Sequence, residues 1–284
     1  PLVIRVGKWR RVITIPSVAD CTSTAIDVTQ TRLPRNRTEG NIPRIALSTG
    51  SADALECILR SNKLGLDDSE FTPETGTGRV NLYAGANGAA YYAPTLNGGA
   101  RFTASAPTPP GSWWDTYENL AKYDIILLSC EGAQYMNYKS PTALQNLEKY
   151  ISKGGRVFAS HWHNVWIQKS VALPAPSAEP PLTTVAQFID PIAMGNGYSN
   201  DNTTDEATIN TGFAKGQALQ QWLQNAMALT PQGKLPIKYV RATVMKTNAN
   251  VMPAKTNPDP ALTQNWITLT KTNGTLDNQL ANPP

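Results

Sequence analysis

Residues 123–160 contain the pattern that most constrains how this chain folds. They open with YDIILLS, a nearly all-apolar run that is typical of a β-strand covered on both faces. Ser140 and Pro141 then supply an N-cap and a first-turn proline for a helix, and Gly154 and Gly155 end it. The segment RVFAS is the next strand. Strand, helix and strand in this order form a βαβ unit, so the sequence predicts parallel strands with a right-handed crossover.

The alternation of strands and helices continues outside this unit. Residues 44–50 form a short apolar run that ends in small residues, and Ser51 can cap a helix whose apolar positions are Leu55, Ile58 and Leu59. Residues 79–83 indicate another strand, and residues 212–229 indicate a further helix. We therefore expect an α/β domain over residues 43–245, with an open, mostly parallel sheet and helices on both faces.

Strand-like patterns flank this domain at both termini. Apolar and polar residues alternate over residues 3–6 and 11–15, so residues 1–42 are expected to be a β-rich N-terminal arm or the end of a β-sandwich. Residues 246–284 are rich in Thr, Asn and Pro, with one strand-like piece at 266–269, and are expected to form an extended tail. Both ends lie in strand-like or loop-like sequence, which suggests a piece of a longer precursor.

Composition narrows the classes of function. Charged residues make up 16% of the chain, against roughly 25% in an average soluble domain, and polar uncharged residues replace them, as in many exported proteins. The net charge of +4 is spread along the chain apart from Lys8-Trp9-Arg10-Arg11, unlike the basic element of a nucleic-acid binder. No apolar run is long enough to span a membrane. We expect an extracellular, cell-surface or periplasmic protein.

The three cysteines allow one disulfide and one free thiol. No C-x-x-C pair occurs, which excludes a zinc ribbon. Cys130 ends an apolar strand, where a buried free thiol is usual. In an exported protein, Cys21 in the loop before the α/β domain and Cys57 on its first helix are then the expected disulfide pair.

The first candidate site is Ser160-His161-Trp162-His163-Asn164, which holds both histidines of the chain and follows a predicted strand. Ligand sites of open α/β sheets lie at the carboxyl ends of strands. Residues two apart on an extended chain point the same way, so His161 and His163 could face one ligand, beside Ser160, Trp162 and Asn164. Alternatively, these side chains close the top of the sheet and bond to loops. Neither a resident metal nor a cofactor is expected.

The second candidate site is Cys130-Glu131, at the end of the neighbouring predicted strand. Cys130 facing His161 across the top of the sheet would suit Cys–His catalysis, whereas the alternative is a small apolar residue that ends a strand. A charge directly after a buried strand usually has a partner, so one is expected for Glu131. The pair Trp113-Trp114 either stacks on a sugar ring or packs in the core.

Residues 123–164 resemble the class I glutamine amidotransferase-like superfamily, whose domain is flavodoxin-like α/β. YDIILLS looks like the strand before that family's glycine-rich oxyanion turn, and GGRVFASH at 154–161 looks like its helix end and nucleophile strand. The family's catalytic cysteine would fall near Ser160 or His161, so it is not retained, and no His-x-Glu pair follows. The resemblance implies a fold and a site position but not amidotransferase activity. The flanking β segments look like those of secreted or lipoprotein-type bacterial proteins of unassigned function.

Two functions remain open. The first is an extracellular or cell-surface module with a binding or structural role, self-assembly included, and a degenerate amidotransferase-like site. Its expected partners are neighbouring β modules of the precursor or copies of itself, with a cell-envelope glycan as candidate ligand. The second is a hydrolase that acts on a glycan or amide substrate through Glu131, His161 and His163, with or without a metal ion.

Overall fold

The computed structural model describes residues 1–60, 65–104, 113–173, 181–188, 204–238, 245–247 and 264–271. The chain divides into two compact units, Pro1–Trp166 with Leu173–Glu179, and Ile167–Ala172 with Pro180–Pro284. The α/β domain expected over residues 43–245 therefore spans parts of both units. Most of the tail expected over residues 246–284 lies outside the described residues.

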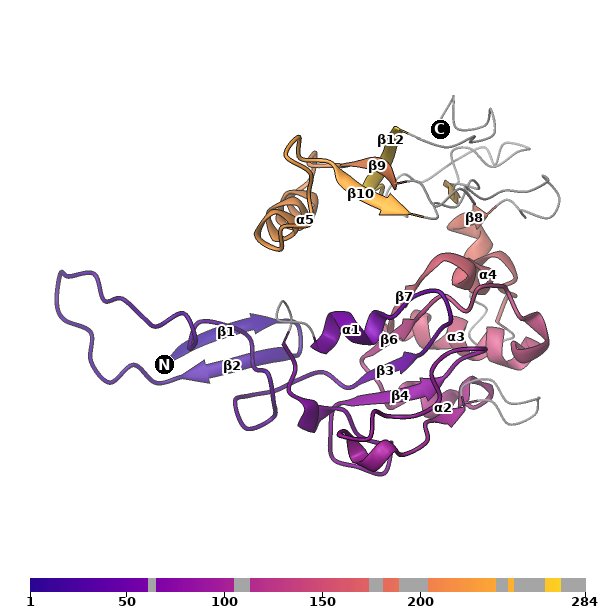
Figure 1. Ribbon diagram of the computed structural model, residues 1–284, viewed down its shortest axis with the longest axis horizontal. Coiled ribbons are helices and arrows are strands. Elements are labelled where there is room, and N and C mark those ends of the chain that lie inside the picture. Colours follow the sequence, from indigo (N-terminus) through magenta and orange to yellow (C-terminus); the bar gives the residue numbers. More distant parts are fainter. Residues whose placement is uncertain are drawn as a thin grey trace. The chain divides into compact units, whose positions relative to one another are not determined.

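The first unit is built on a parallel sheet (Figure 1). Its strands are β3 (Ile45–Ser48), β4 (Val80–Ala84), β5 (Thr103–Ala104), β6 (Ile125–Leu128) and β7 (Arg156–Ala159), in the order β5-β4-β3-β6-β7. Every pairing in this sheet is parallel. The prediction of a mixed α/β chain with a parallel sheet is confirmed, and the two strands of the βαβ unit, β6 and β7, are neighbours.

The strand order reverses between β3 and β6. Ser48 at the end of β3 lies level with Tyr83 of β4 on one side and Leu128 of β6 on the other. The chain runs outward from β3 to β4 and β5, then returns to β6 and continues outward to β7. Connections that leave two neighbouring strands in opposite directions create a crevice at the carboxyl ends of those strands. The segments after β3, β6 and β7 are therefore the ones that position a candidate site.

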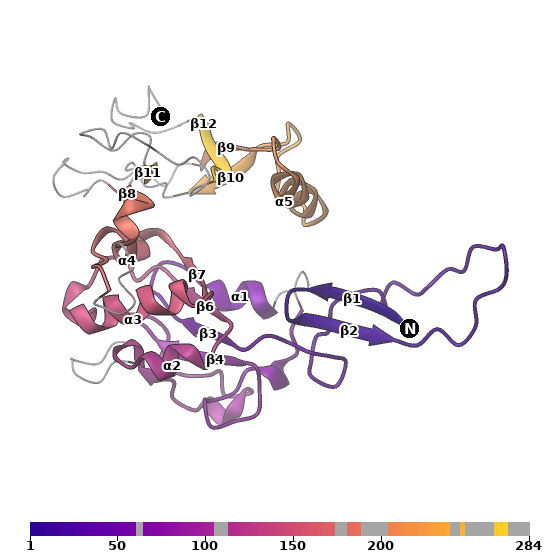
Figure 2. The same cartoon turned by 180° about the vertical axis from the view of Figure 1, so that it is seen from behind.

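One face of the sheet packs against α2 (Tyr117–Ala121) and α3 (Pro141–Ser152), both labelled in Figure 2. The Ser140 hydroxyl accepts a hydrogen bond from Ala143 N at 3.0 Å, which caps α3 as the sequence predicts. Leu144 and Leu147 of α3 are buried in one cluster with Ile126 of β6. The aromatic members of this cluster are Tyr83, Trp113, Trp114, Tyr123, Tyr150 and Trp166.

The opposite face of the parallel sheet is covered mainly by irregular segments rather than by helices. Residues two apart in a strand share a face, so Ile45 and Leu47 of β3 both lie on this side. Leu59 of the short helix α1 (Leu55–Arg60) packs here, and the other buried contacts come from irregular segments, at Leu66, Phe71, Tyr92 and Phe102. The stretch between β4 and β5 is rich in Gly, Asn and Pro, which disfavour helices.

The first two strands, β1 (Leu2–Val6) and β2 (Trp9–Ile13), form the antiparallel hairpin that the alternation predicts. Gly7 in its turn has a φ of +58°, which glycine adopts without the penalty of a Cβ atom. Leu2 and Ile4 are half-buried, whereas Val3 and Val12 lie opposite each other and are exposed. The hairpin thus has one partly covered face and one exposed face.

Hydrogen bonds and an ion pair attach this hairpin to the rest of the first unit. Arg10 and Asn41 exchange backbone hydrogen bonds of 2.9 and 2.8 Å. The indole of Trp9 donates to Pro34 O at 2.8 Å. Lys8, in the turn, forms an ion pair with Asp124, which directly precedes β6. The hairpin is therefore fixed beside the amino ends of the parallel strands.

The second unit contains antiparallel pairs and one longer helix, α5 (Ala214–Asn225), which matches the helix predicted over residues 212–229. β9 (Thr204–Ile209) pairs with β10 (Leu235–Lys238) and β12 (Ile267–Lys271), and β8 (Ala186–Phe188) pairs with β11 (Met245–Thr247). β9 lies within residues 171–210, where four prolines, at 174, 176, 180 and 181, lead us to expect a loop from the sequence. Its buried positions Asp205, Ala207 and Ile209 include a charge. The short helix α4 (Val165–Gln168) spans the boundary between the units in sequence.

Candidate functional site

The segments that follow β3 and β6 meet at the carboxyl edge of the sheet. Ala52 N donates a hydrogen bond to Cys130 O at 3.0 Å, and Ser51 Oγ donates to Glu131 O at 2.8 Å. A Cβ atom on Gly50 would lie only 2.1 Å from Cys130 O, so this approach requires glycine. The backbone of the two segments therefore fills the crevice between β3 and β6.

Glu131 has the partner that the sequence leads us to expect. Its Oε2 lies 2.6 Å from Lys139 Nζ, and its Oε1 accepts a hydrogen bond from Ala86 N at 3.0 Å. Lys139 Nζ also donates to Gln134 O at 2.8 Å. Both side chains of the pair are 1% exposed, and burial lowers the pKa of Lys139. A carboxylate saturated in this way fixes the segment after β6 and is not presented to a substrate.

His163 is enclosed by its neighbours in the same way. Its Nδ1 accepts a hydrogen bond from Trp166 Nε1 at 2.9 Å, so Nε2 carries the proton. Nε2 lies 2.9 Å from Ser129 O, to which it donates. Burial, and then the positive charge of Lys139, lower the pKa of His163 to about 3. The neutral ring uses both nitrogens inside the protein, which corrects the predicted catalytic role of His163.

His161 lies apart from His163 and contacts Cys130, with 3.2 Å between Nδ1 and Sγ. The extended chain expected here is wrong, because His161–Asn164 form a turn of 3₁₀ helix and the two histidines have different partners. His161 has a φ of +40°, a left-handed conformation that is strained for a residue with a Cβ atom. β7 therefore ends in a sharp strand-to-helix turn, the geometry that exposes nucleophiles in α/β hydrolases.

The thiol of Cys130 is in contact with His161 but closed to solvent. Cys130 is 1% exposed, and burial raises the pKa of its thiol. Gly132 N lies 3.5 Å from Sγ, and its hydrogen bond lowers the pKa of the thiol, but by less than burial raises it. A reactive cysteine needs a lowered pKa and access. The geometry of a Cys–His pair is thus present without its activation.

Asp53 completes this group, and sequence reasoning missed it. Asp53 lies between β3 and α1, and its Oδ2 accepts hydrogen bonds from Cys130 N at 3.3 Å and from the Ser160 hydroxyl. Asp53, Ser160 and His161 are half-buried, so they form the accessible part of the cluster around the buried thiol. One signal in the sequence could have identified Asp53. It is a carboxylate in the segment that follows a predicted strand, and ligand sites of such sheets lie where the strand order reverses.

The other predicted ligand residues belong to the interior. Trp113 stacks on Tyr83 with ring centroids 4.3 Å apart, and Trp113 and Trp114 are 4% and 1% exposed. This corrects the sugar-stacking interpretation, because neither indole has a face open to solvent. The remaining buried members of the predicted set are Trp162 and Asn164.

The structure does not form the disulfide expected between Cys21 and Cys57. Both are exposed free thiols, Cys21 with a φ of +54° in the loop after β2 and Cys57 on α1. The later part of that loop bonds back to the hairpin, where Arg11 Nη1 donates to Thr29 O at 2.8 Å. The loop is therefore held by β2 and not by α1.

Comparisons of the chain with protein-family models, curated proteins and solved structures found no significant match. Within the described residues, no group of three or more His, Cys, Asp or Glu side chains could hold a metal ion. In that same part of the chain, no helix is both long and apolar enough to cross a membrane. The geometry of the strand ends is therefore the basis for assigning a function.

Proposed function

We propose that this chain is an extracellular or cell-surface module with a binding or structural role, whose strand ends serve stability rather than turnover. The closure of those ends carries the proposal. Glu131, Lys139 and His163 are each 2% exposed or less and are hydrogen-bonded within the protein. An acid, base or metal ligand must reach its substrate or ion, and these three groups are engaged elsewhere.

The resemblance to amidotransferase-like domains supports the same reading of the site. In that family, the turn after the second strand of the βαβ unit carries the catalytic cysteine. Here the strained turn carries His161, and Ser160 before it bonds to Asp53. A degenerate site would keep the turn and lose the catalytic cysteine, which is the combination found here. The proposal includes an open sheet with α1 on one face and α2 and α3 on the other.

The exposed face of the N-terminal hairpin supports a role in contacting other proteins. Val3 and Val12 are 51% and 45% exposed and lie opposite each other on this face. A two-stranded sheet is marginal alone, and its edges are templates for pairing. A neighbouring β module or a second copy of the chain is therefore the proposed partner. The low charge content, 16%, is in keeping with a location outside the cytoplasm.

Thiol labelling tests the closed site. In the Cys21→Ser/Cys57→Ser variant, Cys130 is the remaining thiol. We expect it to react with Ellman's reagent about a hundredfold more slowly in the folded protein than in guanidinium chloride, because it is buried and its pKa is raised. The Cys57→Ser/Cys130→Ser variant, which keeps the exposed Cys21, is the matched control. Equal labelling of folded and unfolded Cys130 would remove the proposal.

A hydrolase is the second candidate function, and the 3.2 Å contact between Cys130 Sγ and His161 Nδ1 favours it. In that mechanism His161 takes the thiol proton, Cys130 attacks an amide carbonyl, and the proton passes to the leaving amine. Water then hydrolyses the thioester. Glu131 and His163 take no part, because their polar atoms are already bonded. Turnover of a panel of peptides that Cys130→Ala and His161→Gln both abolish would establish this function.

A further inference from the structure

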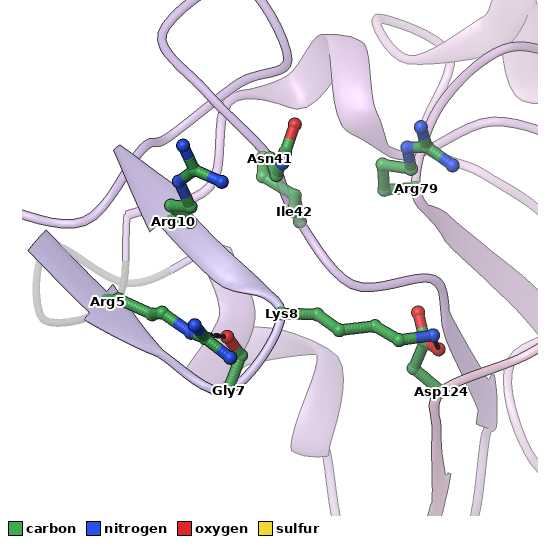
Figure 3. Close-up of a pocket in the computed structure, with 8 residues that line it drawn as sticks. All are labelled: Arg5, Gly7, Lys8, Arg10, Asn41, Ile42, Arg79 and Asp124. Atoms are coloured by element: carbon green, nitrogen blue, oxygen red, sulfur yellow. Dashed lines mark hydrogen bonds and ion pairs between the residues drawn. The ribbon is translucent and has the colours of Figure 1, made fainter. Parts of the chain in front are cut away.

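A second site lies at the other end of the sheet from the strand ends described above. A pocket of about 390 Å³ lies between the N-terminal hairpin and the amino ends of the parallel strands, and Figure 3 shows the residues that line it. Arg5, Lys8 and Arg10 reach it from the hairpin. Arg79 directly precedes β4, and Asp124 directly precedes β6. These five charged residues make the pocket distinct from the apolar clusters on the two faces of the sheet.

The pocket has a surplus of positive charge. Four cationic side chains line it, against the one carboxylate of Asp124. Asp124 is already engaged, because it forms an ion pair with Lys8 and accepts a hydrogen bond from Arg44 N at 2.9 Å. Figure 3 shows Lys8 extending from the hairpin turn to this carboxylate. The three arginines that line the pocket therefore have no further carboxylate within it.

Arg5 and Arg10 are direct partners across the hairpin. Side chains at such positions share a face of the sheet and lie close together, and like charges placed there destabilise an antiparallel pair. The side chain of Arg5 is held beside the turn, since its Nε donates to Gly7 O at 2.9 Å. Both arginines therefore bring positive charge to the pocket from the same face of the hairpin.

Arg79 adds a cation whose hydrogen bonding is incomplete. Its buried Nε has no hydrogen-bond partner among the described residues. Glu70 accepts a hydrogen bond from the backbone N of Arg79 at 3.1 Å, but its carboxylate pairs with Arg37 at 3.2 Å. Because this atom is buried, Arg79 acts on the pocket through its positive charge and not through Nε.

We propose that this pocket binds a phosphate monoester carried on a sugar-sized, polar framework. The guanidinium group of arginine can donate two parallel hydrogen bonds to the oxygens of a phosphate. A phosphate monoester carries nearly two negative charges at neutral pH, so it neutralises more of the positive charge in the pocket than a single carboxylate would. A volume of about 390 Å³ exceeds the needs of a lone phosphate and lies in the range of small-molecule sites. Ile42 is the one large apolar side chain in the lining, so the framework carries hydroxyls.

The proposal goes beyond the binding role assigned above, because it names a site and a ligand class that do not involve the closed strand ends. Calorimetric titration with glucose 6-phosphate at low salt tests it, with glucose as the uncharged control. We expect binding that weakens as NaCl is added, since salt screens the charges. Glucuronate, with one carboxylate, should bind more weakly than glucose 6-phosphate.

Variants locate the binding in the pocket. Arg5→Gln/Arg10→Gln and Arg79→Gln should each lower the affinity for glucose 6-phosphate about tenfold or more, since each removes charge-assisted hydrogen bonds. Arg101→Gln is the matched control, because Arg101 is an exposed arginine over the ring of Tyr91 and does not line the pocket. Arg5 and Arg10 are exposed, and a melting temperature equal to or above that of the wild type will show that the double variant is folded.

The phosphate monoester could belong to an envelope glycan or to a free sugar phosphate. A polysaccharide with terminal mannose 6-phosphate groups distinguishes these two sources. Tighter binding of the polymer than of the free sugar phosphate would identify an envelope glycan, and the reverse would identify a free sugar phosphate; either result supports the pocket. Two results would overturn the proposal. One is an affinity for glucose 6-phosphate no greater than that for glucose, and the other is an equal affinity in the wild type and Arg5→Gln/Arg10→Gln.

Discussion

The carboxylate of Glu131 and the ammonium group of Lys139 form an ion pair with 2.6 Å between Oε2 and Nζ, and each side chain is 1% exposed. Lys139 Nζ also lies 5.7 Å from the ring centroid of Trp114 and 5.9 Å from that of Trp166. A charge in such a place depends on its partner, because an isolated buried ion is strongly unfavourable. The pair therefore connects the segment after β6 to the start of α3.

Removing only one partner of this ion pair should strongly destabilise the folded protein. We expect Lys139→Met to lower the free energy of unfolding by about 3–5 kcal/mol, because Glu131 would stay buried without its counter-ion. The double variant Glu131→Gln/Lys139→Met should regain about 2 kcal/mol or more, since no buried charge remains. Urea denaturation followed by tryptophan fluorescence measures both changes.

The surface pair of Arg60 and Asp68 provides the control for that experiment. These side chains are 46% and 57% exposed, and their nearest charged atoms are 2.7 Å apart. Arg60→Met should change the free energy of unfolding by less than about 1 kcal/mol, because solvent screens an exposed pair. Losses of equal size for Lys139→Met and Arg60→Met would contradict a structural role for the buried pair.

The protein should lose stability as the pH falls below neutrality, and His163 is the expected cause. Its pKa is lowered from an ordinary value of 6.5 to about 3 in the folded state. The unfolded chain therefore binds the proton first, so this contribution is complete above pH 6.5 and is lost progressively toward pH 3. The slope should reach at most about 1.4 kcal/mol per pH unit. Urea denaturation across this range measures it.

Two substitutions assign that slope to one residue. His163→Gln removes the titrating group but can still donate to Ser129 O and accept from Trp166. His161→Gln removes the other histidine of the chain and leaves His163 in place. We expect the slope near pH 6 to disappear in the first variant and persist in the second. The opposite pattern would refute the assignment.

The βαβ unit could be predicted because each of its parts is encoded locally. The apolar run before Ser129, the cap at Ser140 and the glycines at 154 and 155 specify β6, α3 and β7 within a short stretch. The contacts at its ends depend on strand order instead. Asp53 meets Ser160 across 107 positions of sequence, and hydrophobic periodicity carries no information on such a pairing. Sequence therefore indicated which strand ends to consider, but not which residues meet there.

Two other differences have the same origin. The sequence indicates that Trp113 and Trp114 are either ligand-binding or buried, and only their stacking against a strand of the sheet decides between these roles. β9 was missed because Asp205 occupies a buried position of the strand, where a charge weakens the apolar alternation. In both cases the environment of the side chain, and not its type, determines its role.

Gly50→Ala should open the contact between the segments after β3 and β6. The new Cβ atom would lie 2.1 Å from Cys130 O and 2.6 Å from Ser129 O, and backbone atoms cannot move aside as side chains do. We expect a loss of about 1–3 kcal/mol in the free energy of unfolding, together with faster thiol labelling of Cys130. Gly212→Ala is the control, since its nearest atom is the side-chain oxygen of Asn210 at 3.1 Å. Unchanged stability of Gly50→Ala would show that the crevice is not closed by this contact.

The left-handed conformation of His161 allows backbone strain to be separated from the role of the imidazole. His161→Ala and His161→Gly both remove the ring and its 3.2 Å contact with Cys130 Sγ, so they lose the same side-chain interactions. Alanine alone retains a Cβ atom, which is unfavourable at a φ of +40°. We therefore expect His161→Gly to be more stable than His161→Ala by about 1 kcal/mol in urea denaturation. Equal stability of the two variants would mean that the turn relaxes once the ring is gone, and that the imidazole contact with Cys130, rather than the path of the chain, maintains the strain.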